Sequence, residues 1–336
     1  QIKGRLSASR FEYSLDLITS AAVFIAREKG FHPVRDYLIS CKWDEEPRID
    51  TWLSKYGGVV KTEYTQYVGR KTLIAAVKRI FDPGCKFDNV LVFEGLQDIG
   101  KSYCWELLSY PWFTAAPLNL HDKGAVEVMQ GKWICELDEM DALTKYESQT
   151  IKGFLTRTED RVRMAYGRFA KNFPRHNIFV GTINPEQHGW LKDRTGNRRY
   201  WPVQTTMIDI KGLIHDRDQL WAEAVKAYES GEIIYTEDTK MKELMRQEVS
   251  NRQQEDPWFG PIEDYLHEHE KEYVVEDEIQ VLPLDLYTHA ISGGAAAFGM
   301  KESGRIASIL KMLGYTKTTG KNRVGTIYTR PHTGEM

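Results

Sequence analysis

Cysteine is scarce in this sequence of 336 residues: there are four, and no two of them form a C-x-x-C pair. That scarcity argues against a disulfide framework or a cysteine-rich metal cluster, so we expect reduced and mostly buried thiols. Apolar runs are short, and none approaches the ~20 residues that a membrane helix needs. The run at residues 18–26 also lacks the basic flank and cleavage site of a signal peptide. We therefore expect a cytoplasmic protein without a membrane partner, in which this run is a buried helix.

Internal repeats, low-complexity tracts and a strong charge of one sign are also missing. The net charge is -3 at pH 7, so charge alone does not indicate a polyanionic partner. With 41% hydrophobic and 28% charged residues, the composition is that of an ordinary globular protein. Because single cores seldom grow beyond about 250 to 300 residues, we expect more than one domain. The first residue is Gln1 and not methionine, which is typical of a fragment and leaves open whether a primase or another domain precedes it.

The periodicity of apolar residues predicts three domains. Residues 1–84 carry helical patterns and predict an N-terminal helical, collar-like domain. Residues 85–250 alternate helical patterns with short apolar runs, which is typical of an α/β fold with buried parallel strands. Residues 251–336 predict three helices and a hairpin, an order that resembles a winged helix.

The predicted elements are these. Helical patterns in the first domain cover residues 11–28, 48–58 and 65–81. Strand-like runs in the second domain are residues 90–93, 133–135, 177–182 and 200–203. A polar linker is predicted at residues 250–257, followed by helices at 262–270, 283–290 and 301–313 and a hairpin at 315–330.

A glycine-rich segment follows the first predicted strand and precedes a helix. Gly95, Gly100, Lys101 and Ser102 have the spacing G-x-x-x-x-G-K-S, in which backbone N–H groups cradle phosphate and the lysine reaches the β and γ phosphates. The serine hydroxyl can bind Mg²⁺, and the helix directs its positive end at the anion. The segment predicts an ATP site made by Gly95, Leu96, Gln97, Asp98, Ile99, Gly100, Lys101, Ser102 and Tyr103. Asp98 is unusual, because a carboxylate close to a phosphate weakens its binding unless it points away.

Acidic residues follow the second predicted strand, where open α/β sheets bind ligands. We expect Glu136 and Glu139 to be the catalytic pair, with Asp138 as a third candidate. Ser102, Glu136 and Asp138 are the candidate Mg²⁺ ligands. The alternative is that these acids are ordinary solvated residues of a loop. The phosphate-binding segment upstream favours a catalytic role for them.

Polar and cationic residues accompany the last two predicted strands. Asn184 ends one of them and is suited to orient the attacking water or the γ phosphate, although a strand-end asparagine can also simply form a turn. Arg194, Arg198 and Arg199 precede the other strand. Arginine disperses charge on a transferring phosphoryl group, often from a neighbouring subunit. Arg198 or Arg199 is the candidate for that role, and their spacing does not separate them.

Two basic regions are candidates for contact with nucleic acid. Residues 161–185 contain no acidic residue and interleave cations with Tyr166, Phe169 and Phe173, as expected for a hairpin that tracks a single strand. The cations there are Arg161, Arg163, Arg168, Lys171 and Arg175, of which Arg163, Arg168 and Lys171 are the predicted contacts. A basic edge that pairs with acids of another domain is the alternative. In the last domain, duplex phosphates would meet Arg305, Lys311, Lys317, Lys321 and Arg323, unless that domain only binds protein.

Six segments between Phe31 and Val203, taken in order, resemble the virulence-associated protein E family of phage and pathogenicity-island ATPases. They are FHPVRDYLISCKWDEEPRIDTWL, PGCKFDNVLVFEGLQDIGKS, WICELDEMDAL, IKGFLTRTEDRVRMAYGR, PRHNIFVGTIN and DRTGNRRYWPV. These proteins are similar to superfamily 3 helicases and to the helicase half of poxvirus-type primase-helicases. Two departures stand out: Asp98 replaces a usual glycine, and TIN replaces the commoner TTN.

The resemblance implies an AAA+ module behind a helical collar that assembles as a hexameric ring and uses ATP and Mg²⁺ to move along DNA. It implies that Asn184 is the sensor, that Arg198 and Arg199 include the finger, and that the segment round Arg168 and Lys171 lines the pore. The expected protein is phage- or island-encoded and lies in the bacterial cytoplasm, with single-stranded or forked DNA and a possible primase or initiator as partners.

Three functions remain open from the sequence. The first is an ATP-dependent DNA helicase or translocase that acts in replication of a phage or mobile genetic island. The second is a DNA-binding replication initiator or regulator for which nucleotide is only an assembly switch. The third is an AAA+ remodeller or packaging motor that acts on protein or duplex without unwinding.

Overall fold

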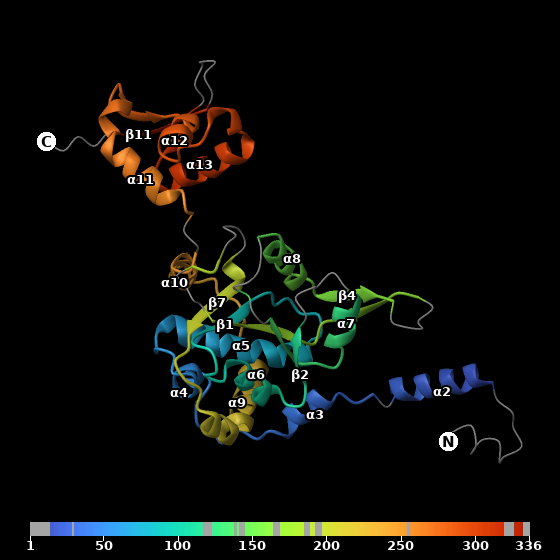
Figure 1. The fold of residues 1–336 in the computed structure, drawn as a ribbon. Coiled ribbons are helices and arrows are strands. Elements are labelled where there is room, and N and C mark those ends of the chain that lie inside the picture. Colours follow the sequence, from blue (N-terminus) through green and yellow to red (C-terminus); the bar gives the residue numbers. More distant parts are fainter. Residues whose placement is uncertain are drawn as a thin grey trace, which may run out of the picture. The chain divides into compact units, whose positions relative to one another are not determined.

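The structure is a computed structural model, and it describes residues 14–28, 30–116, 123–137, 140, 145–163, 169–184, 189–191, 197–253, 256–318 and 326–331. The chain forms two compact units, residues 1–253 and 254–336 (Figure 1). The predicted linker at residues 250–257 therefore spans the division between the units, and its first residues belong to the first unit.

A five-stranded parallel sheet is the centre of the first unit, and its strand order is β2-β3-β6-β1-β7. The strands are β1 (Val90–Glu94), β2 (Phe113–Ala116), β3 (Ile134–Leu137), β6 (Ile178–Ile183) and β7 (Tyr200–Gln204). Four of them were predicted, with ends that differ by one or two residues. The edge strand β2 was missed, because its sequence Phe-Thr-Ala-Ala has only one strongly apolar residue.

Helices precede the sheet, connect its strands and follow it. The helices before β1 are α2 (Leu15–Glu28), α3 (Pro33–Ser40), α4 (Trp52–Gly57) and α5 (Glu63–Phe81). Between strands lie α6 (Lys101–Ser109), α7 (Lys123–Met129), α8 (Lys145–Leu155) and the 3₁₀ turn η1 (Asn197–Arg199). The unit ends with α9 (Ile210–Glu229) and α10 (Thr239–Ser250).

Successive side chains of the strands enter cores on opposite faces of the sheet, as the pleat requires. Leu91 and Phe93 pack into a core with α3, α4, α5, α6 and α9. Val90 and Val92 pack into a second core with α7 and α8. Burial on both faces explains the continuous apolar strands. The helices predicted as a separate domain before residue 84 thus contribute α3, α4 and α5 to the core that covers one face of the sheet.

Helix α2 differs from its prediction as a buried helix. Phe24 is 62% exposed and Ile25 is 53% exposed, although both lie in the apolar run at residues 18–26. The prediction of burial is therefore wrong for these side chains, because an apolar run indicates a helix without identifying a surface that covers it. None of the described helices combines the length and the apolar character that a bilayer crossing needs.

A hairpin lies outside the central sheet and consists of β4 (Glu159–Val162) and β5 (Lys171–Pro174). The strands are antiparallel, and Val162 pairs with Lys171 nearest the turn. A hairpin was predicted within residues 161–185, and the observed strands cover residues 159–162 and 171–174.

The second unit contains helices α11 (Phe259–Glu268), α12 (Pro283–His289) and α13 (Met300–Met312) and the 3₁₀ turns η2 (Glu270–Tyr273) and η3 (Ala295–Ala297). Its four-stranded antiparallel sheet has the order β10-β11-β9-β8. The strands are β8 (Val274–Val275), β9 (Glu278–Val281), β10 (Thr316–Thr318) and β11 (Ile327–Pro331). The predicted helices and hairpin strands are present, whereas the pair β8 and β9 was not predicted; the winged-helix assignment stays a prediction.

All four cysteines are free, as the sequence suggested. Cys104 and Cys135 are buried, whereas Cys41 and Cys85 are partly exposed. Burial raises the pKa of the Cys135 thiol to about 12, so this side chain stays a neutral, unreactive thiol.

Candidate functional site

The phosphate loop, defined here as Gly95–Ser102, joins the carboxyl end of β1 to α6. Two of its positions require glycine. A Cβ at Gly95 would lie 2.3 Å from the carbonyl oxygen of Thr205, and Gly100 has a φ of 92° directly before the helix. The glycine spacing recognised in the sequence is therefore a steric requirement of this turn.

The ammonium of Lys101 is surrounded by oxygen atoms at the carboxyl edge of the sheet. It donates hydrogen bonds to the carbonyl oxygens of Gly95 (2.9 Å) and Leu96 (2.7 Å) and to Oδ1 of Asn184 (2.6 Å). Lys101 is only 7% exposed, whereas Asn184 and Leu96 lie at the surface. Because β6 lies next to β1, the predicted asparagine meets the predicted lysine.

A second cluster joins the phosphate loop to β3. Oε1 of Glu136 accepts hydrogen bonds from Oγ of Ser102 (2.8 Å) and from Oγ1 of Thr182 (2.6 Å). Glu136 is 2% exposed and lies within β3 rather than after it, since the strand extends to Leu137. The structure thus brings together three predicted residues, Ser102 and Glu136 here and Asn184 nearby.

Thr182 was not singled out in the sequence, although a signal for it existed. It lies two residues before Asn184, and alternate residues of a strand share a face. Asp138 and Glu139, the other predicted acids, lie outside the described residues. Their assignments to Mg²⁺ and to catalysis stay predictions.

A buried ion pair supports the phosphate loop from behind. Glu94, the last residue of β1, accepts hydrogen bonds from Nε of Arg252 (2.5 and 2.7 Å) and from Nε1 of Trp190 (2.7 Å). The Arg252 and Glu94 side chains are 17% and 7% exposed. Burial alone would lower the pKa of Arg252, but its hydrogen bonds to Glu94 and the nearby carboxylate charges raise it, so the guanidinium stays charged.

Sequence reasoning missed these supporting residues. There was a weak signal for Glu94 in the sequence, because this charged residue ends the apolar run at residues 90–93 and directly precedes Gly95. Arg252 carried none, since it belongs to a stretch whose polarity indicated a linker. Its backbone carbonyl also accepts from the N–H of Leu191 (3.1 Å), which anchors the end of the first unit beside the phosphate loop.

The conformation of Asp98 accounts for its unusual place in the loop. Its φ is 64°, in the left-handed region that glycine prefers and aspartate tolerates, and its side chain is exposed. The carboxylate therefore projects into solvent, as a charge next to a phosphate site should.

Removal of this charge is expected to strengthen ATP binding. Asp98→Asn keeps a side chain that tolerates the left-handed region and should lower the Kd for ATP roughly threefold to tenfold at low salt. The gain should shrink as ionic strength rises, because exposed charges are screened. Isothermal titration calorimetry at two salt concentrations measures both effects.

Glu106→Gln is the matched control, since it removes an exposed carboxylate from α6 without touching the loop. An equal gain in this control, or no gain in Asp98→Asn, would show that the Asp98 charge does not weaken the site. Asp98→Gly should resemble Asp98→Asn in affinity, because the free loop already has the left-handed conformation.

The candidate finger residues lie at the opposite edge of the sheet. Arg198 and Arg199 directly precede β7, and strands of a parallel sheet share one amino edge and one carboxyl edge. Nε of Arg199 forms an ion pair with Asp88 (3.2 Å), and both side chains are mostly buried. The Arg198 side chain is exposed. The structure therefore separates two arginines that the sequence could not distinguish; Arg194 lies outside the described residues.

The predicted DNA-binding hairpin carries its exposed cations near its turn. Arg163 follows β4 and Lys171 begins β5, and both are exposed, as is Phe169 at 78%. Arg168 and Tyr166 lie outside the described residues. The described part of the hairpin thus offers two cations and an aromatic ring to solvent, which a strand-tracking element requires.

Arg175, which was counted with these cations, has a structural position. It is 3% exposed, and its guanidinium donates to Asp160 (2.7 and 2.8 Å) and to the carbonyl oxygen of Phe154 (2.8 Å). Its inclusion in a nucleic-acid surface is therefore wrong. The sequence shows that Arg175 is charged, but it does not show that Asp160, fifteen residues earlier in the chain, is its buried partner.

The basic residues of the second unit divide in the same way. Arg305 pairs with Asp256 (2.6 Å) and lies over the ring of Trp258, 3.9 Å from its centroid. That engagement argues against the predicted phosphate contact for Arg305. Lys311 and Lys317 are exposed, whereas Lys321 and Arg323 lie outside the described residues.

Comparison with known proteins supplies a family and a fold. A family model for the virulence-associated protein E-like domain matches residues 38–255. Curated protein sequences gave no match. An apo structure of the NrS-1 C-terminal region is similar, with a TM-score of 0.50 and 11% identity over 87% of this chain and 78% of that chain. A second apo structure of that region gives a TM-score of 0.47 at 11% identity, over 87% of this chain and 77% of that chain. At such identity the likeness concerns the fold alone, a mixed α/β arrangement with a parallel central sheet.

Proposed function

Because the chain belongs to the virulence-associated protein E-like family, we propose that it is an ATP- and Mg²⁺-dependent DNA helicase or translocase for replication of a phage or mobile genetic island. Its core would be an AAA+ module that works as a homo-oligomeric, hexameric ring on single-stranded or forked DNA. A primase or initiator is the proposed partner.

One observation supports this proposal most directly: Lys101 and Asn184 meet beside Ser102 and Glu136 at the carboxyl edge of a parallel sheet. These residues come from β1, α6, β3 and β6, and open α/β sheets bind ligands at this edge. A phosphate-binding turn, a lysine, a hydroxyl, a carboxylate and an amide are the groups that phosphoryl transfer requires.

Each group has a distinct part in the proposed reaction. The Lys101 ammonium, which now binds two carbonyl oxygens and the Asn184 amide, would exchange these neutral acceptors for the β and γ phosphates. The Asn184 amide would then be released to orient the attacking water or the γ phosphate. Glu136 would hold its carboxylate at a fixed place, because Thr182 donates to it from β6.

The oxygen atoms of Ser102 and Glu136 fit a Mg²⁺ ion. Magnesium prefers hard oxygen ligands and usually takes one or two protein ligands besides phosphates and water. The Ser102 hydroxyl and the Glu136 carboxylate lie 2.8 Å apart, so both can reach one ion. The bound ion would neutralise charge on the β and γ phosphates. The surrounding residues exclude water from one side of this pair, since Glu136 is 2% exposed.

The exposed Arg198 supports an assembly in which neighbours complete the site. It lies at the amino edge of the sheet, away from the phosphate loop of its own chain. An arginine there can approach transferring phosphate only on another protomer. This geometry is what a ring with hydrolysis at subunit interfaces needs.

ATP hydrolysis measured with and without single-stranded DNA tests the proposal, together with strand separation on a forked duplex and on a blunt duplex. We expect DNA-stimulated turnover and preferential separation of the fork. ATP-dependent assembly with negligible strand separation would instead indicate an initiator or regulator. Equal activity on the blunt duplex without separation would indicate a remodeller or packaging motor, and no hydrolysis at all would end the proposal.

The hairpin is expected to couple hydrolysis to DNA. Arg168→Ala combined with Lys171→Ala should leave basal ATP hydrolysis unchanged and remove most of its stimulation by single-stranded DNA, because two phosphate contacts are lost per protomer. Steady-state ATPase assays at several salt concentrations measure this effect. Lys226→Ala on α9 is the control, since it removes an exposed lysine far from the hairpin in sequence. Full stimulation in the double variant would contradict the DNA assignment.

A further inference from the structure

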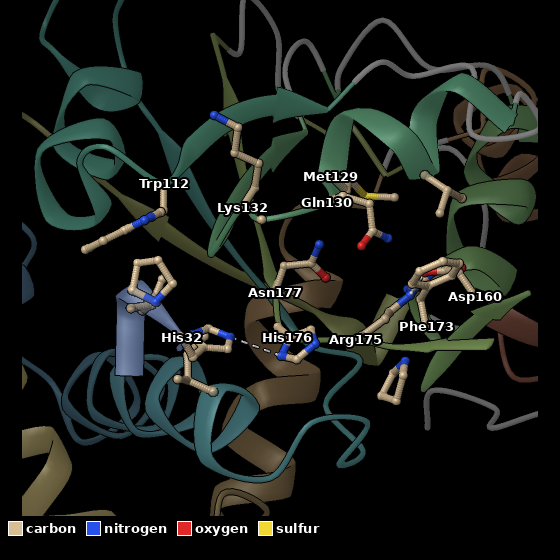
Figure 2. Close-up of a pocket in the computed structure, with 16 residues that line it drawn as sticks. His32, Trp112, Met129, Gln130, Lys132, Asp160, Phe173, Arg175, His176 and Asn177 are labelled. Carbon is tan, nitrogen blue, oxygen red and sulfur yellow. Dashed lines mark hydrogen bonds and ion pairs between the residues drawn. The ribbon is translucent and has the colours of Figure 1, made fainter. Parts of the chain in front are cut away.

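A pocket of about 250 Å³ lies at the amino edge of the sheet, where β2, β3 and β6 begin (Figure 2). It is separate from the phosphate loop, which lies at the carboxyl edge. Its walls come from residues before α3, from the end of α7, and from the hairpin strand β5. Residues far apart in the sequence thus enclose one space.

The floor of the pocket carries a hydrogen-bond acceptor without a partner in the described structure. Asn177 is 7% exposed, and its Oδ1 accepts no hydrogen bond from any described group. Its Nδ2 faces the Sγ of Cys135 at 3.5 Å, so the oxygen is turned the other way. Figure 2 shows the Asn177 amide projecting into the pocket. A buried acceptor of this kind is costly unless a water molecule or a ligand donates to it, so it marks a place where a ligand donor can be accepted.

Flat side chains surround this acceptor. Trp112 and Phe173 line opposite parts of the pocket, and His32 and His176 lie beside it with their ring nitrogens 3.4 Å apart. Burial lowers the pKa of His176, and the charges of His32 and Arg79 lower it further, so its imidazole is neutral at pH 7. The pocket therefore offers aromatic faces to an uncharged, planar group.

The ionic groups of the pocket limit what else it can hold. The carboxylate of Asp160 is neutralised by Arg175, at 2.7 Å, so no carboxylate there is left for a cation. Lys132 lines the pocket and is partly exposed, which places its positive charge next to solvent. A ligand with an N–H group on a flat ring and an anionic substituent would fit this pocket. Its N–H group would meet Oδ1 of Asn177, its ring would meet the aromatic side chains, and its anionic group would meet Lys132.

We propose that this pocket binds a nucleobase carrying a 5′-phosphate, with a base N–H group donating to Oδ1 of Asn177 and the phosphate facing Lys132. The volume of about 250 Å³ is below the range of about 300 to 1,000 Å³ for pockets that enclose drug-sized ligands, so it suits the base, with the sugar and phosphate at the mouth of the pocket. Either a free nucleotide or one residue of a single strand can supply this chemistry.

The position of the hairpin favours the strand as the source. Strand β5 begins at Lys171, a proposed DNA contact, and continues to Phe173 and the wall of the pocket. A strand that runs along β5 could place one base in the pocket, where stacking on aromatic rings is tolerant of base identity. The inference deepens the proposed DNA contact and is independent of ATP hydrolysis.

Binding of deoxynucleoside monophosphates, measured by calorimetry on the whole chain, tests the pocket. Asn177→Leu should weaken this binding about tenfold or more, because a donor of the ligand would be left unpaired. Lys132→Ala should also weaken monophosphate binding. Because Lys132 is partly exposed, this variant should fold normally, and thermal unfolding checks that it does. Asn172→Leu on β5 is the matched control, because it changes an exposed amide of the same strand that does not line the pocket.

Photo-crosslinking distinguishes the two sources. An oligonucleotide with 5-iododeoxyuridine should crosslink to peptides that contain Trp112 or Phe173, and Asn177→Leu should reduce the yield. Saturable monophosphate binding without such crosslinks would assign the pocket to a free nucleotide. The inference is overturned if no monophosphate binds at millimolar concentration and no crosslink reaches these peptides, or if Asn177→Leu leaves both the binding and the crosslink yield unchanged. Loss of hydrolysis with intact monophosphate binding would overturn the proposed function alone.

Discussion

Replacement of Lys101 by alanine is expected to reduce ATP hydrolysis at least about 100-fold, the size of effect seen when one preorganised donor to a transition state is removed. The ammonium is buried and directed at the phosphate loop by Gly95, Leu96 and Asn184. It is therefore already held beside the phosphate loop, and it needs only to exchange these neutral acceptors for phosphate oxygens. A coupled ATPase assay measures the loss, and fluorescent nucleotide binding shows whether affinity falls with it.

Lys226→Ala is the control for this variant as well, because Lys226 is an exposed lysine paired only with Glu229 among the contacts described. Thermal unfolding should show that Lys101→Ala is folded, since the two carbonyl oxygens that lose a donor face a solvent-exposed loop. Hydrolysis within threefold of the unchanged protein would contradict the phosphate-loop assignment.

Replacement of Arg198 by alanine should lower turnover about 10³-fold or more, as expected for an arginine that stabilises charge on the transferring phosphoryl group. ATP binding should change little, because the phosphate loop of the same chain is intact. Arg199→Ala should act differently. It breaks a mostly buried ion pair with Asp88 and should cost about 1 to 3 kcal/mol of folding free energy. Turnover and chemical denaturation measured on both variants separate the two roles.

A mixing experiment tests whether Arg198 acts on a neighbour. Arg198→Ala protomers keep a functional phosphate loop, and Lys101→Ala protomers keep the arginine. Mixed assemblies should contain interfaces with both groups and should regain hydrolysis that neither variant has alone. Mixtures as inactive as their components would contradict action between subunits, and a larger loss of turnover in Arg199→Ala than in Arg198→Ala would reverse the assignment.

The phosphate loop could be predicted from the sequence because its glycines, lysine and serine follow one another at a fixed spacing in the chain. The left-handed φ of Gly100 is a local constraint, whereas the close approach of Gly95 to Thr205 is a product of the fold. The strands of the parallel sheet were predictable for a similar reason, since burial on both faces demands continuous apolar runs. Glu136 and Asn184 followed from the rule that such sheets bind ligands at their carboxyl edge.

Other features depended on contacts between distant segments. Arg175 and Arg163 look alike in the sequence, yet one is buried against Asp160 and the other is exposed. Arg252 lies in a stretch that indicated a linker, and only its contact with Glu94 shows that it supports the phosphate loop. The pocket around Asn177 has no sequence signature, because its walls come from elements that lie far apart in the chain.

The sequence by itself determined the phosphate loop, the parallel strands and the family, because the loop residues keep a fixed spacing and burial on both faces of the sheet leaves continuous apolar runs. Only the tertiary structure decided which of Arg198 and Arg199 is exposed, which cations are buried, and that Oδ1 of Asn177 receives no hydrogen bond from the described residues. Those properties depend on partners brought close by the fold. An arginine is written identically in the sequence whether it faces solvent or, like Arg175, lies 2.7 Å from a carboxylate.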